Sequence, residues 1–375
     1  MKRPRILISG YYGFGNAGDE AMLTAILGAL YEREPNAVVT VISGNPARTR
    51  ETHGVQAISR LAMPRILREV SRCDLLISGG GSLLQDVTSK RSLYYYLGII
   101  RLALWCKKPV FLYAQGIGPL FRLAARNTVR DILNRTQAIT VRDKGSQELL
   151  TELGVTTPPI TVTADAVLAM HPGDPDIGRM LMRRYGISGI APKIGVSVRE
   201  WRGNGQYKQK LAQACDELQH RTDGQIIFIP MQYPEDKVAA EDIASAMKKP
   251  AVVLDEAYTT AELMGIIGAM DVVIGIRLHA LIFAALMGVP SVGISYDPKV
   301  DRFLESVGEK AIATIDNVDA DALAELTLKR LQQGISDTER KQVAILRSRS
   351  EATADYALRL LGREKHNDST HRETI

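Results

Sequence analysis

The residue types best suited to chemistry stand together in the stretch Arg277-Leu278-His279. A strand-like run ends at Gly275 just before them, and a very apolar helical segment begins near Ala280. Backbone N–H groups at the start of a helix attract anions, and an arginine fork beside them binds phosphate or carboxylate strongly. A histidine next to apolar sequence is most often a packed core residue, but the nearby arginine and the helix start favour a functional one. We therefore predict an anion site here, with His279 as a general acid.

Two other cations follow strand-like runs and could serve the same anion. Lys299 comes soon after the run Val289–Ile294, and Arg142 directly follows the run Ala138–Val141. A solvated surface lysine and a local ion pair of the arginine with its neighbour are the ordinary interpretations. In open parallel sheets, however, ligands bind beyond the carboxyl ends of the strands, where both side chains would lie. We predict that Arg142 and Lys299 join Arg277 in binding a phosphate or carboxylate.

A glycine-rich loop follows the first predicted strand and contains Gly13, Gly15 and Gly18 in the spacing GxGxxG. A dinucleotide site with that spacing also has an acidic residue at the end of the second strand, where it binds the ribose. The second strand here runs into residues 41–45, which contain no acid. We therefore predict neither a nicotinamide nor a flavin site. The plain alternative is a tight turn whose acidic residue Asp19 interacts with the helix dipole.

The polar residues of this loop favour a role in sugar binding over a plain turn. Asn16, Asp19 and Glu20 lie together at the end of the predicted strand. Amide and carboxylate groups form the hydrogen bonds that sugar hydroxyls need, and a carboxylate can also accept a proton. We predict that Gly15 and Asn16 contact a sugar acceptor, and that Asp19 or Glu20 is a catalytic base.

Two further loops follow predicted strands and carry glycines and amides. Three consecutive glycines after the run Leu75–Ser78 would expose backbone N–H groups, which suit anions or hydroxyls. A flexible turn into a helix, and a loop-capping role for Gln115, are alternatives of equal weight. The predicted acceptor contacts in these loops are Gly80, Gly81, Ser82, Gln85, Asp86 and Gln115.

The hydrophobic pattern alternates short apolar runs with longer helical segments, which is typical of parallel sheets covered by helices. In the first half, strands are expected at Arg5–Ser9, Val38–Ile42, Leu75–Ser78, Val110–Ala114, Ala138–Val141 and Ile160–Val162. After a segment rich in Gly and Pro, strands are expected at Lys193–Val198, Ile226–Pro230, Ala251–Leu254, Asp271–Gly275, Val289–Ile294 and Ala311–Ile315. We therefore predict an α/β fold of two Rossmann-like domains with parallel sheets and an active site in the cleft between them.

The domains are expected at residues 1–170 and 193–345, the first on the acceptor side and the second on the donor side. A linker with a short helix would cover residues 171–192. A helical pattern begins at Asp337 and runs to Leu361, and residues 346–361 of it are assigned to a separate C-terminal helix. The polar tail 362–375 is expected to be disordered.

Composition narrows the class of protein. The 375 residues suit two domains, and 47 basic against 42 acidic residues leave a net charge of +5, which suits anionic partners. No dense basic run with interleaved aromatic residues is present, so we predict no nucleic-acid partner. Three scattered cysteines without a CxxC motif indicate reduced thiols and a cytoplasmic protein. We find no signal peptide, membrane span or metal-ligand motif in the sequence, and we predict neither a metal nor a cofactor.

Five stretches, in their order along the chain, resemble the polysaccharide pyruvyl transferases: GNAGDEAML, GGGSLLQD, AQGIGP, VRD and IRLHALIFAALMGVPSVGISYDPK. The resemblance runs from about Arg5 to about Glu305. Within the family, the sequence is most similar to the branch that modifies the secondary cell-wall polymer anchoring S-layer proteins. It implies a GT-B-like fold, phosphoenolpyruvate as donor and a pyruvate ketal as product. The residues that it assigns to the donor are Arg142, Arg277, His279 and Lys299, and we also expect Leu278, which lies between two of them, to contact the donor.

These observations lead us to expect transfer of pyruvate onto a sugar, N-acetylmannosamine, of a lipid-linked cell-wall polysaccharide precursor, with release of phosphate. An ordinary GT-B glycosyltransferase that uses a nucleotide sugar, and a non-catalytic anion-binding protein, are the alternatives. The protein is expected at the inner face of the cell membrane. There the basic, apolar stretches Leu93–Lys108 and Phe121–Arg135 would contact anionic lipid.

Overall fold

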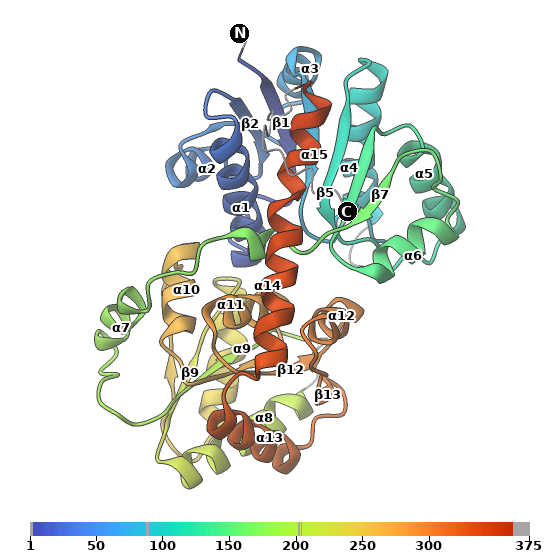
Figure 1. Cartoon of the computed structure of the whole chain (residues 1–375). Helices are drawn as coiled ribbons and strands as arrows, with labels where there is room; N and C mark the ends of the chain where they lie inside the picture. The colour runs from blue at the N-terminus through green and yellow to red at the C-terminus, as the bar shows by residue number, and fades with distance from the viewer. Residues whose placement is uncertain (1–2, 88–89, 202, 204, 363–375) are drawn as a thin grey trace, which may run out of the picture.

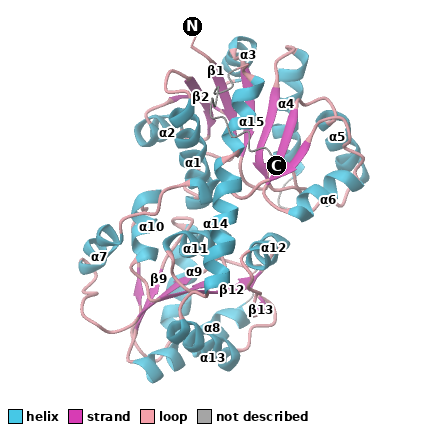
Figure 2. Cartoon of the chain, in the orientation of Figure 1, coloured by secondary structure: helices cyan, strands magenta, loops and turns pink. Residues whose placement is uncertain are grey.

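Two parallel β-sheets form the frame of the protein, and the computed structural model describes residues 3–87, 90–201, 203 and 205–362. The first sheet has the strand order β3-β2-β1-β4-β5-β6-β7, and the second has the order β10-β9-β8-β11-β12-β13. Figure 2 shows the strands as two separate groups, each with helices around it. The predicted α/β fold with two parallel sheets is thereby confirmed.

The strands coincide closely with the predicted apolar runs, because strands buried on both faces need nearly continuous hydrophobic sequence. The first sheet consists of β1 (Arg5–Ser9), β2 (Val38–Ser43), β3 (Gln56–Ser59), β4 (Leu75–Gly79), β5 (Val110–Gln115), β6 (Ala138–Val141) and β7 (Ile160–Val162). The second consists of β8 (Lys193–Ser197), β9 (Gln225–Phe228), β10 (Val252–Val253), β11 (Val272–Gly275), β12 (Ser291–Ser295) and β13 (Ala313–Thr314). The prediction missed β3, an edge strand with the partly polar sequence QAIS.

Helices connect the strands and cover both sheets. In the first half they are α1 (Ala17–Arg33), α2 (Pro46–His53), α3 (Met63–Arg72), α4 (Lys90–Trp105), α5 (Leu123–Leu133) and α6 (Lys144–Glu152), followed by the 3₁₀ turn η1 (Ala166–Ala169). In the second half they are α7 (Pro175–Arg183), α8 (Gly205–Thr222), α9 (Glu235–Ala246), α10 (Thr260–Gly268), α11 (Leu278–Met287), α12 (Pro298–Ser306), α13 (Ala320–Gln333), α14 (Asp337–Glu351) and α15 (Thr353–Leu360).

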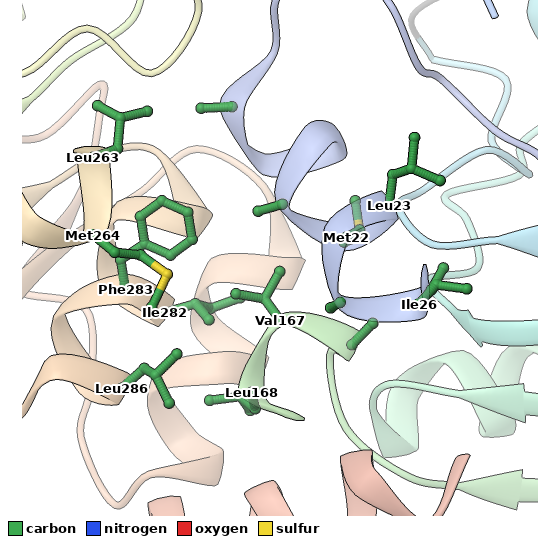
Figure 3. Packing of buried hydrophobic residues seen from close by; sticks show 14 of the residues in the cluster. Met22, Leu23, Ile26, Val167, Leu168, Leu263, Met264, Ile282, Phe283 and Leu286 are labelled. Atoms are coloured by element: carbon green, nitrogen blue, oxygen red, sulfur yellow. The ribbon is translucent and has the colours of Figure 1, made fainter. Parts of the chain in front are cut away.

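An apolar core joins the two halves of the molecule. Side chains of α1, η1, α10 and α11 belong to one continuous cluster of buried residues. Figure 3 shows Val167 of η1 between Met22 of α1 on one side and Ile282 and Phe283 of α11 on the other. Because burial of apolar surface is the main favourable term in folding, this cluster holds the two sheets in a defined relation to each other.

The last two helices cross from the second half back to the first (Figure 1). The C-terminal helical pattern forms two helices, since α14 ends at Glu351 and α15 starts at Thr353, and α14 runs without a break through the predicted domain boundary at 345/346. The Arg33 Nε donates to Asp355 Oδ1 at 2.5 Å, and the Ser350 hydroxyl donates to the carbonyl oxygen of Asp165 at 2.9 Å. The C-terminal helices therefore tie both halves together.

The predicted linker contains α7, and this helix packs closely on α10. Gly178 of α7 lies directly against the backbone of Gly265, so that a Cβ atom would come within 2.0 Å of the Gly265 carbonyl oxygen. The segment is therefore part of the second half as well as a connection. Apart from Gly362, the tail predicted to be disordered lies outside the described residues. Over the described chain, no helix is both long and apolar enough to cross a membrane.

Candidate active site

The carboxyl ends of strands from both sheets meet across a cleft, and direct contacts bridge it. The Ala17 backbone N–H, at the start of α1, donates to the Met231 carbonyl oxygen at 2.8 Å. Further along the cleft, Arg302 of α12 donates to Asp143 Oδ1 at 3.2 Å. The loops after the strands therefore face one another, which is where ligands bind in sheets of this kind.

His279 lies in the second residue position of α11, and its ring packs against the start of α1 from the other half. A Cβ atom on Gly18 would come within 2.0 Å of His279 Nδ1, so only glycine fits there. The His279 Nε2 is buried, has no hydrogen-bond partner among the described residues, and lies 3.7 Å from Asp165 Oδ2. A buried ring nitrogen without a partner is rare in native proteins, and at the edge of a cleft it is suited to meet a ligand.

Asp165 joins His279 to Arg142. The Arg142 Nη1 donates to Asp165 Oδ2 at 3.1 Å, and its Nη2 donates to Ser82 Oγ at 2.9 Å. Burial alone would raise the pKa of Asp165, but the interaction with His279 and the charge of Arg142 outweigh it and hold that pKa well below its usual range. Asp165 is therefore ionised at neutral pH. Asp165 was not among the predicted site residues, although it lies just beyond the end of β7.

Arg277 occupies the position predicted for it at the start of α11, but its guanidinium is already engaged. Its Nε and Nη2 donate to the two oxygens of Asp236 in α9, at 2.9 and 2.5 Å, and Nη2 also donates to Gln232 Oε1 at 3.2 Å. Burial lowers the pKa of Arg277, but the Asp236 carboxylate more than compensates and raises it. The pairing uses Nε and Nη2 of the guanidinium, and the predicted contact of Arg277 with the donor stays a prediction.

Lys299 lies in the first turn of α12, and it lines two adjoining cavities of about 410 and 510 Å³. Both cavities are also lined by Arg142, Asp143 and Arg302, and Leu278 lines the larger one. The Lys299 Nζ lies 3.7 Å from Asp297 Oδ2, in a pair that keeps partial contact with solvent. The cleft is thus hollowed where cations from both halves meet.

The glycine-rich loop is built around the cap of α1. The Asn16 Oδ1 accepts hydrogen bonds from the backbone N–H groups of Gly18 and Asp19, at 3.0 and 3.2 Å, and its Nδ2 reaches Gln232 Oε1 at 3.5 Å. Gly15 has a positive φ of 75° and approaches the backbone of Tyr233. Gly15 and Asn16, both predicted to contact the acceptor, therefore also lie at the contact between the two halves.

The two acidic residues of this loop have different surroundings. Burial, and then the charge of Glu20, raise the pKa of Asp19 to about 7, although Lys299 and Arg142 act in the opposite direction. Glu20 instead accepts from the Gly13 N–H at 2.7 Å and lies 3.4 Å from His53 Nε2. Asp19 is therefore the better placed of the two to exchange a proton near neutral pH.

The triple-glycine loop lies beside Asp19. Gly80 and Gly81 have positive φ values of 58° and 72°, and a Cβ atom on Gly81 would come within 3.1 Å of Asp19 Oδ1. Gln115 holds this loop, because its fully buried Nε2 donates to the carbonyl oxygens of both glycines at 3.0 and 2.9 Å. Of the two interpretations of Gln115, the structure thus supports the framework one, and the predicted acceptor contact is corrected.

Asp86 and Gln85 also bond to the protein itself. The buried carboxylate of Asp86 accepts from the backbone N–H groups of Phe121 and Arg122, at 3.0 and 2.9 Å. The Gln85 Oε1 accepts from the Val87 N–H at 2.8 Å. Asp86 is therefore a loop anchor, and this corrects the prediction that it contacts the acceptor. In the described parts of the chain, no three His, Cys, Asp or Glu side chains are grouped so that they could hold a metal ion.

The chain is similar to known proteins both in sequence and in structure. The chain is 21% identical to the amylovoran biosynthesis protein AmsJ of Erwinia amylovora, over 83% of this chain and 88% of that protein. Among solved structures it is similar to the UDP-GlcNAc 2-epimerase of Neisseria meningitidis bound to UDP-GlcNAc, with a TM-score of 0.64, 10% identity, and coverage of 96% of this chain and 99% of that one. It is also similar to HepE of Anabaena in complex with UDP-glucose, with a TM-score of 0.58, 15% identity and 96% coverage of each chain.

These structural neighbours show that the architecture is GT-B-like, and at such low identity they show the fold alone. The family model described as polysaccharide pyruvyl transferase matches residues 16–298, from the cap of α1 to the start of α12. The matched segment contains Asp19, Arg142, Asp165, Arg277 and His279, and it ends one residue before Lys299. The protein belongs to the polysaccharide pyruvyl transferase family.

Proposed function

We propose that the enzyme transfers the pyruvyl group of phosphoenolpyruvate to a sugar of a lipid-linked cell-wall polysaccharide precursor and releases inorganic phosphate. The observation that carries this proposal is the buried Nε2 of His279, which has no hydrogen-bond partner in the described chain and lies 3.7 Å from the ionised Asp165. Arg142 shares that carboxylate, and Lys299 lines the adjoining cavities. A proton donor beside cations suits a donor that carries phosphate and carboxylate.

The reaction proceeds in two additions. His279, as imidazolium, gives its proton to the methylene carbon of phosphoenolpyruvate, which becomes a methyl group, and one sugar hydroxyl adds its oxygen to C2. The oxygen of a second hydroxyl then bonds to C2 while the bond from C2 to the phosphate oxygen breaks. Asp19 accepts one hydroxyl proton, which returns to His279 through solvent, and the other hydroxyl proton leaves with phosphate. The products are a cyclic ketal and inorganic phosphate, and nothing is oxidised or reduced.

Asp19 is the proposed base for the acceptor hydroxyl. Its pKa of about 7 lets it accept a proton near neutral pH, whereas Glu20 is held by Gly13 and His53. Gly81, which lies beside this carboxylate, and its neighbours Gly80 and Ser82 are proposed to contact the acceptor sugar. The ionised Asp165 stabilises the His279 imidazolium until the proton is transferred.

For the acceptor we propose N-acetylmannosamine in a secondary cell-wall polymer of the kind that anchors S-layer proteins. The motif resemblance supports this choice. The relative AmsJ carries a name that refers to amylovoran biosynthesis, so an amylovoran-like acceptor is the competing class. Both acceptors would be presented on a lipid pyrophosphate, and the products would differ in the sugar that carries the ketal.

The decisive test is mass spectrometry of a lipid-linked acceptor incubated with phosphoenolpyruvate and the enzyme. We expect a mass gain of one pyruvyl ketal, with one phosphate released for each ketal formed. His279→Ala should form no product under the same conditions. If the wild-type protein yields no pyruvylated product with any lipid-linked sugar that contains a vicinal or 4,6-diol, the proposal is wrong.

A glycosyltransferase acting on a nucleotide sugar is the second candidate, because structures with this architecture are known with UDP-sugars bound. Calorimetric titration with UDP, UDP-GlcNAc and phosphoenolpyruvate separates the two. We expect phosphoenolpyruvate to bind and the uridine nucleotides not to bind. Tight binding of UDP without binding of phosphoenolpyruvate would favour the second candidate.

We also propose that the first half of the molecule rests on the anionic inner surface of the cell membrane. Most apolar residues of α4, which contains much of the predicted contact Leu93–Lys108, are packed in the core. Exposed apolar residues instead gather beyond the carboxyl ends of β4 and β5, namely Tyr94, Phe121 and Leu123, and exposed Arg122 stands among them. Basic and apolar groups together are suited to an anionic bilayer.

Sedimentation with anionic and neutral vesicles tests this surface. Phe121→Ser with Leu123→Ser should weaken binding to anionic vesicles at low salt. Trp105→Ser is the matched control, because Trp105 is as exposed as Phe121 but lies at the far end of α4. Equal retention of the double variant and the wild-type protein would rule out this surface as the membrane contact.

A further inference from the structure

Arg199 follows β8, a central strand of the second sheet, and has no role in the proposed mechanism. The register of β8 with β11 sets Ser197 opposite Gly275. Arg199 and Arg277 therefore each lie two residues beyond one matched pair, so two arginines leave neighbouring strand ends on the cleft side. Arg277 is occupied by Asp236. The groups that contact Arg199 therefore determine whether its guanidinium can still bind an anion.

Aromatic rings hold the Arg199 guanidinium. Its central carbon lies 4.1 Å from the ring centroid of Tyr296 and 5.4 Å from that of Trp201. The adjacent carboxylate, Glu200, pairs instead with Lys208 Nζ at 2.5 Å. In the described portion of the chain, no carboxylate forms an ion pair with Arg199, and its buried Nε has no hydrogen-bond partner. Stacking on rings fixes a guanidinium in place without neutralising its charge.

Two further buried polar atoms near these strand ends also lack hydrogen-bond partners among the described residues. They are Ser197 Oγ, at the end of β8, and His279 Nε2, just beyond β11. Buried donors in native structures nearly always have a partner, so a group of unpaired ones at adjacent strand ends indicates a ligand that the protein was built to hold. The three atoms therefore point to one polar ligand between β8 and β11.

Lys299 brings a second cation to the same aromatic ring. Its Nζ lies 4.9 Å from the ring centroid of Tyr296, which also carries Arg199. Burial would raise the pKa of Tyr296, but the charges of Lys299, Arg199 and Arg277 outweigh it and lower that pKa. The Tyr296 ring thus lies in a positive field. Of the cations that produce it, Lys299 has only a 3.7 Å pair with Asp297, and Arg199 forms no ion pair among the described residues.

We propose that Arg199, together with Lys299, binds an oxyanion of the donor, and that Arg277 serves as a support for the loop through its pair with Asp236. Where the donor is phosphoenolpyruvate, as proposed above, the bound group is its phosphate or its carboxylate. Tyr296 and Trp201 act as positioning residues, because the guanidinium of Arg199 lies over their rings. The Tyr207 hydroxyl donates to the Arg199 carbonyl oxygen and holds its backbone.

Calorimetric titration of three variants with phosphoenolpyruvate, inorganic phosphate and pyruvate tests the proposal. Arg199→Gln keeps the size and polarity of the side chain but removes its charge, and Arg199→Lys keeps the charge. Arg359→Gln is the matched control, because Arg359 also stacks on a tyrosine ring, that of Tyr356 at 5.3 Å, but on α15. Thermal denaturation of each variant verifies that the fold is intact.

We expect Arg199→Gln to raise the Kd for phosphoenolpyruvate by roughly 10- to 100-fold, the range for losing one charge-assisted hydrogen bond. Arg199→Lys should recover part of the affinity, and Arg359→Gln should bind as the wild type does. A larger loss with inorganic phosphate than with pyruvate assigns Arg199 to the phosphate, and the reverse assigns it to the carboxylate. Unchanged binding of all three ligands by Arg199→Gln overturns the proposal.

The two proposals can fail separately. If the wild-type protein binds inorganic phosphate but not phosphoenolpyruvate, the proposed donor is wrong. The role of Arg199 is then judged by phosphate alone, where weaker binding by Arg199→Gln supports it and equal binding refutes it. If the wild-type protein binds none of the three anions, no oxyanion site exists at Arg199.

Discussion

Asp19→Asn is the perturbation whose effect follows most directly from the structure. Asp19 lies in the first turn of α1, beside Gly81 and at the centre of the charges contributed by Glu20, Lys299 and Arg142. Burial, and then Glu20, raise its pKa from an ordinary 3.8 to about 7. The substitution keeps the shape of the side chain and removes both its charge and its ability to accept a proton.

The effect on stability has a defined sign. Between pH 3.8 and about 7 the unfolded chain has lost this proton while the folded protein keeps it, so stability falls as pH rises and levels off above about pH 7. Each pH unit in that window is worth about 1.36 kcal/mol, which sets an upper bound of about 4 kcal/mol. Asp19 keeps partial solvent contact, and screening lowers the expected value to about 2 kcal/mol.

Urea denaturation of both proteins from pH 5 to pH 8 measures this term. The stability of Asp19→Asn relative to the wild type should increase over that range and level off above pH 7. Asp321→Asn is the control, because Asp321 also lies in a first helical turn but is exposed. A difference that stays flat from pH 5 to pH 8 would show that this carboxyl does not titrate near neutral pH.

Turnover provides the second measurement on the same variant. The wild-type kcat/KM should rise with pH up to about 7, as Asp19 loses its proton and becomes able to accept one. Asp19→Asn should lose about 10²- to 10⁴-fold in rate, the usual contribution of a general base. Activity within a few-fold of the wild type, with the same pH profile, would remove Asp19 from the proposed mechanism.

Three further outcomes are expected. His279→Ala should lower kcat by about 10²- to 10⁴-fold while leaving the fold intact, and steady-state kinetics with circular dichroism would show both. Arg277→Ala should destabilise the protein by about 3–5 kcal/mol in urea denaturation, because it leaves the buried Asp236 carboxylate without its partner; an unchanged unfolding midpoint would contradict this. EDTA should leave activity unchanged, and inactivation that magnesium or manganese reverses would contradict the metal-free scheme.

Much of the scaffold could be predicted from the sequence, because strand signals are local. An apolar run such as Ala138–Val141 has the composition and length of a buried parallel strand whatever its neighbours are. The cap at Asn16 is likewise contained within four residues. The strand β3 escaped prediction because Gln56–Ser59 is an edge strand whose partly polar sequence carries a weak signal.

The sequence by itself therefore determined which loops follow which strands, and so that Asp19, Arg142, His279 and Lys299 lie beyond the carboxyl ends of strands. Only the tertiary structure decided how those side chains are paired. Arg277 and Asp236 are 41 residues apart, and Arg142 and Ser82 are 60 apart, so their contacts depend on the order of strands in the sheet. The cross-half contacts of His279 with Gly18 and Asp165 depend further on the apolar core between α1, η1 and α11. Periodicity acts over a few residues, whereas charge pairing and burial act through space. Only the folded molecule could therefore separate Arg277, which pairs with Asp236, from Arg199, which forms no ion pair among the described residues.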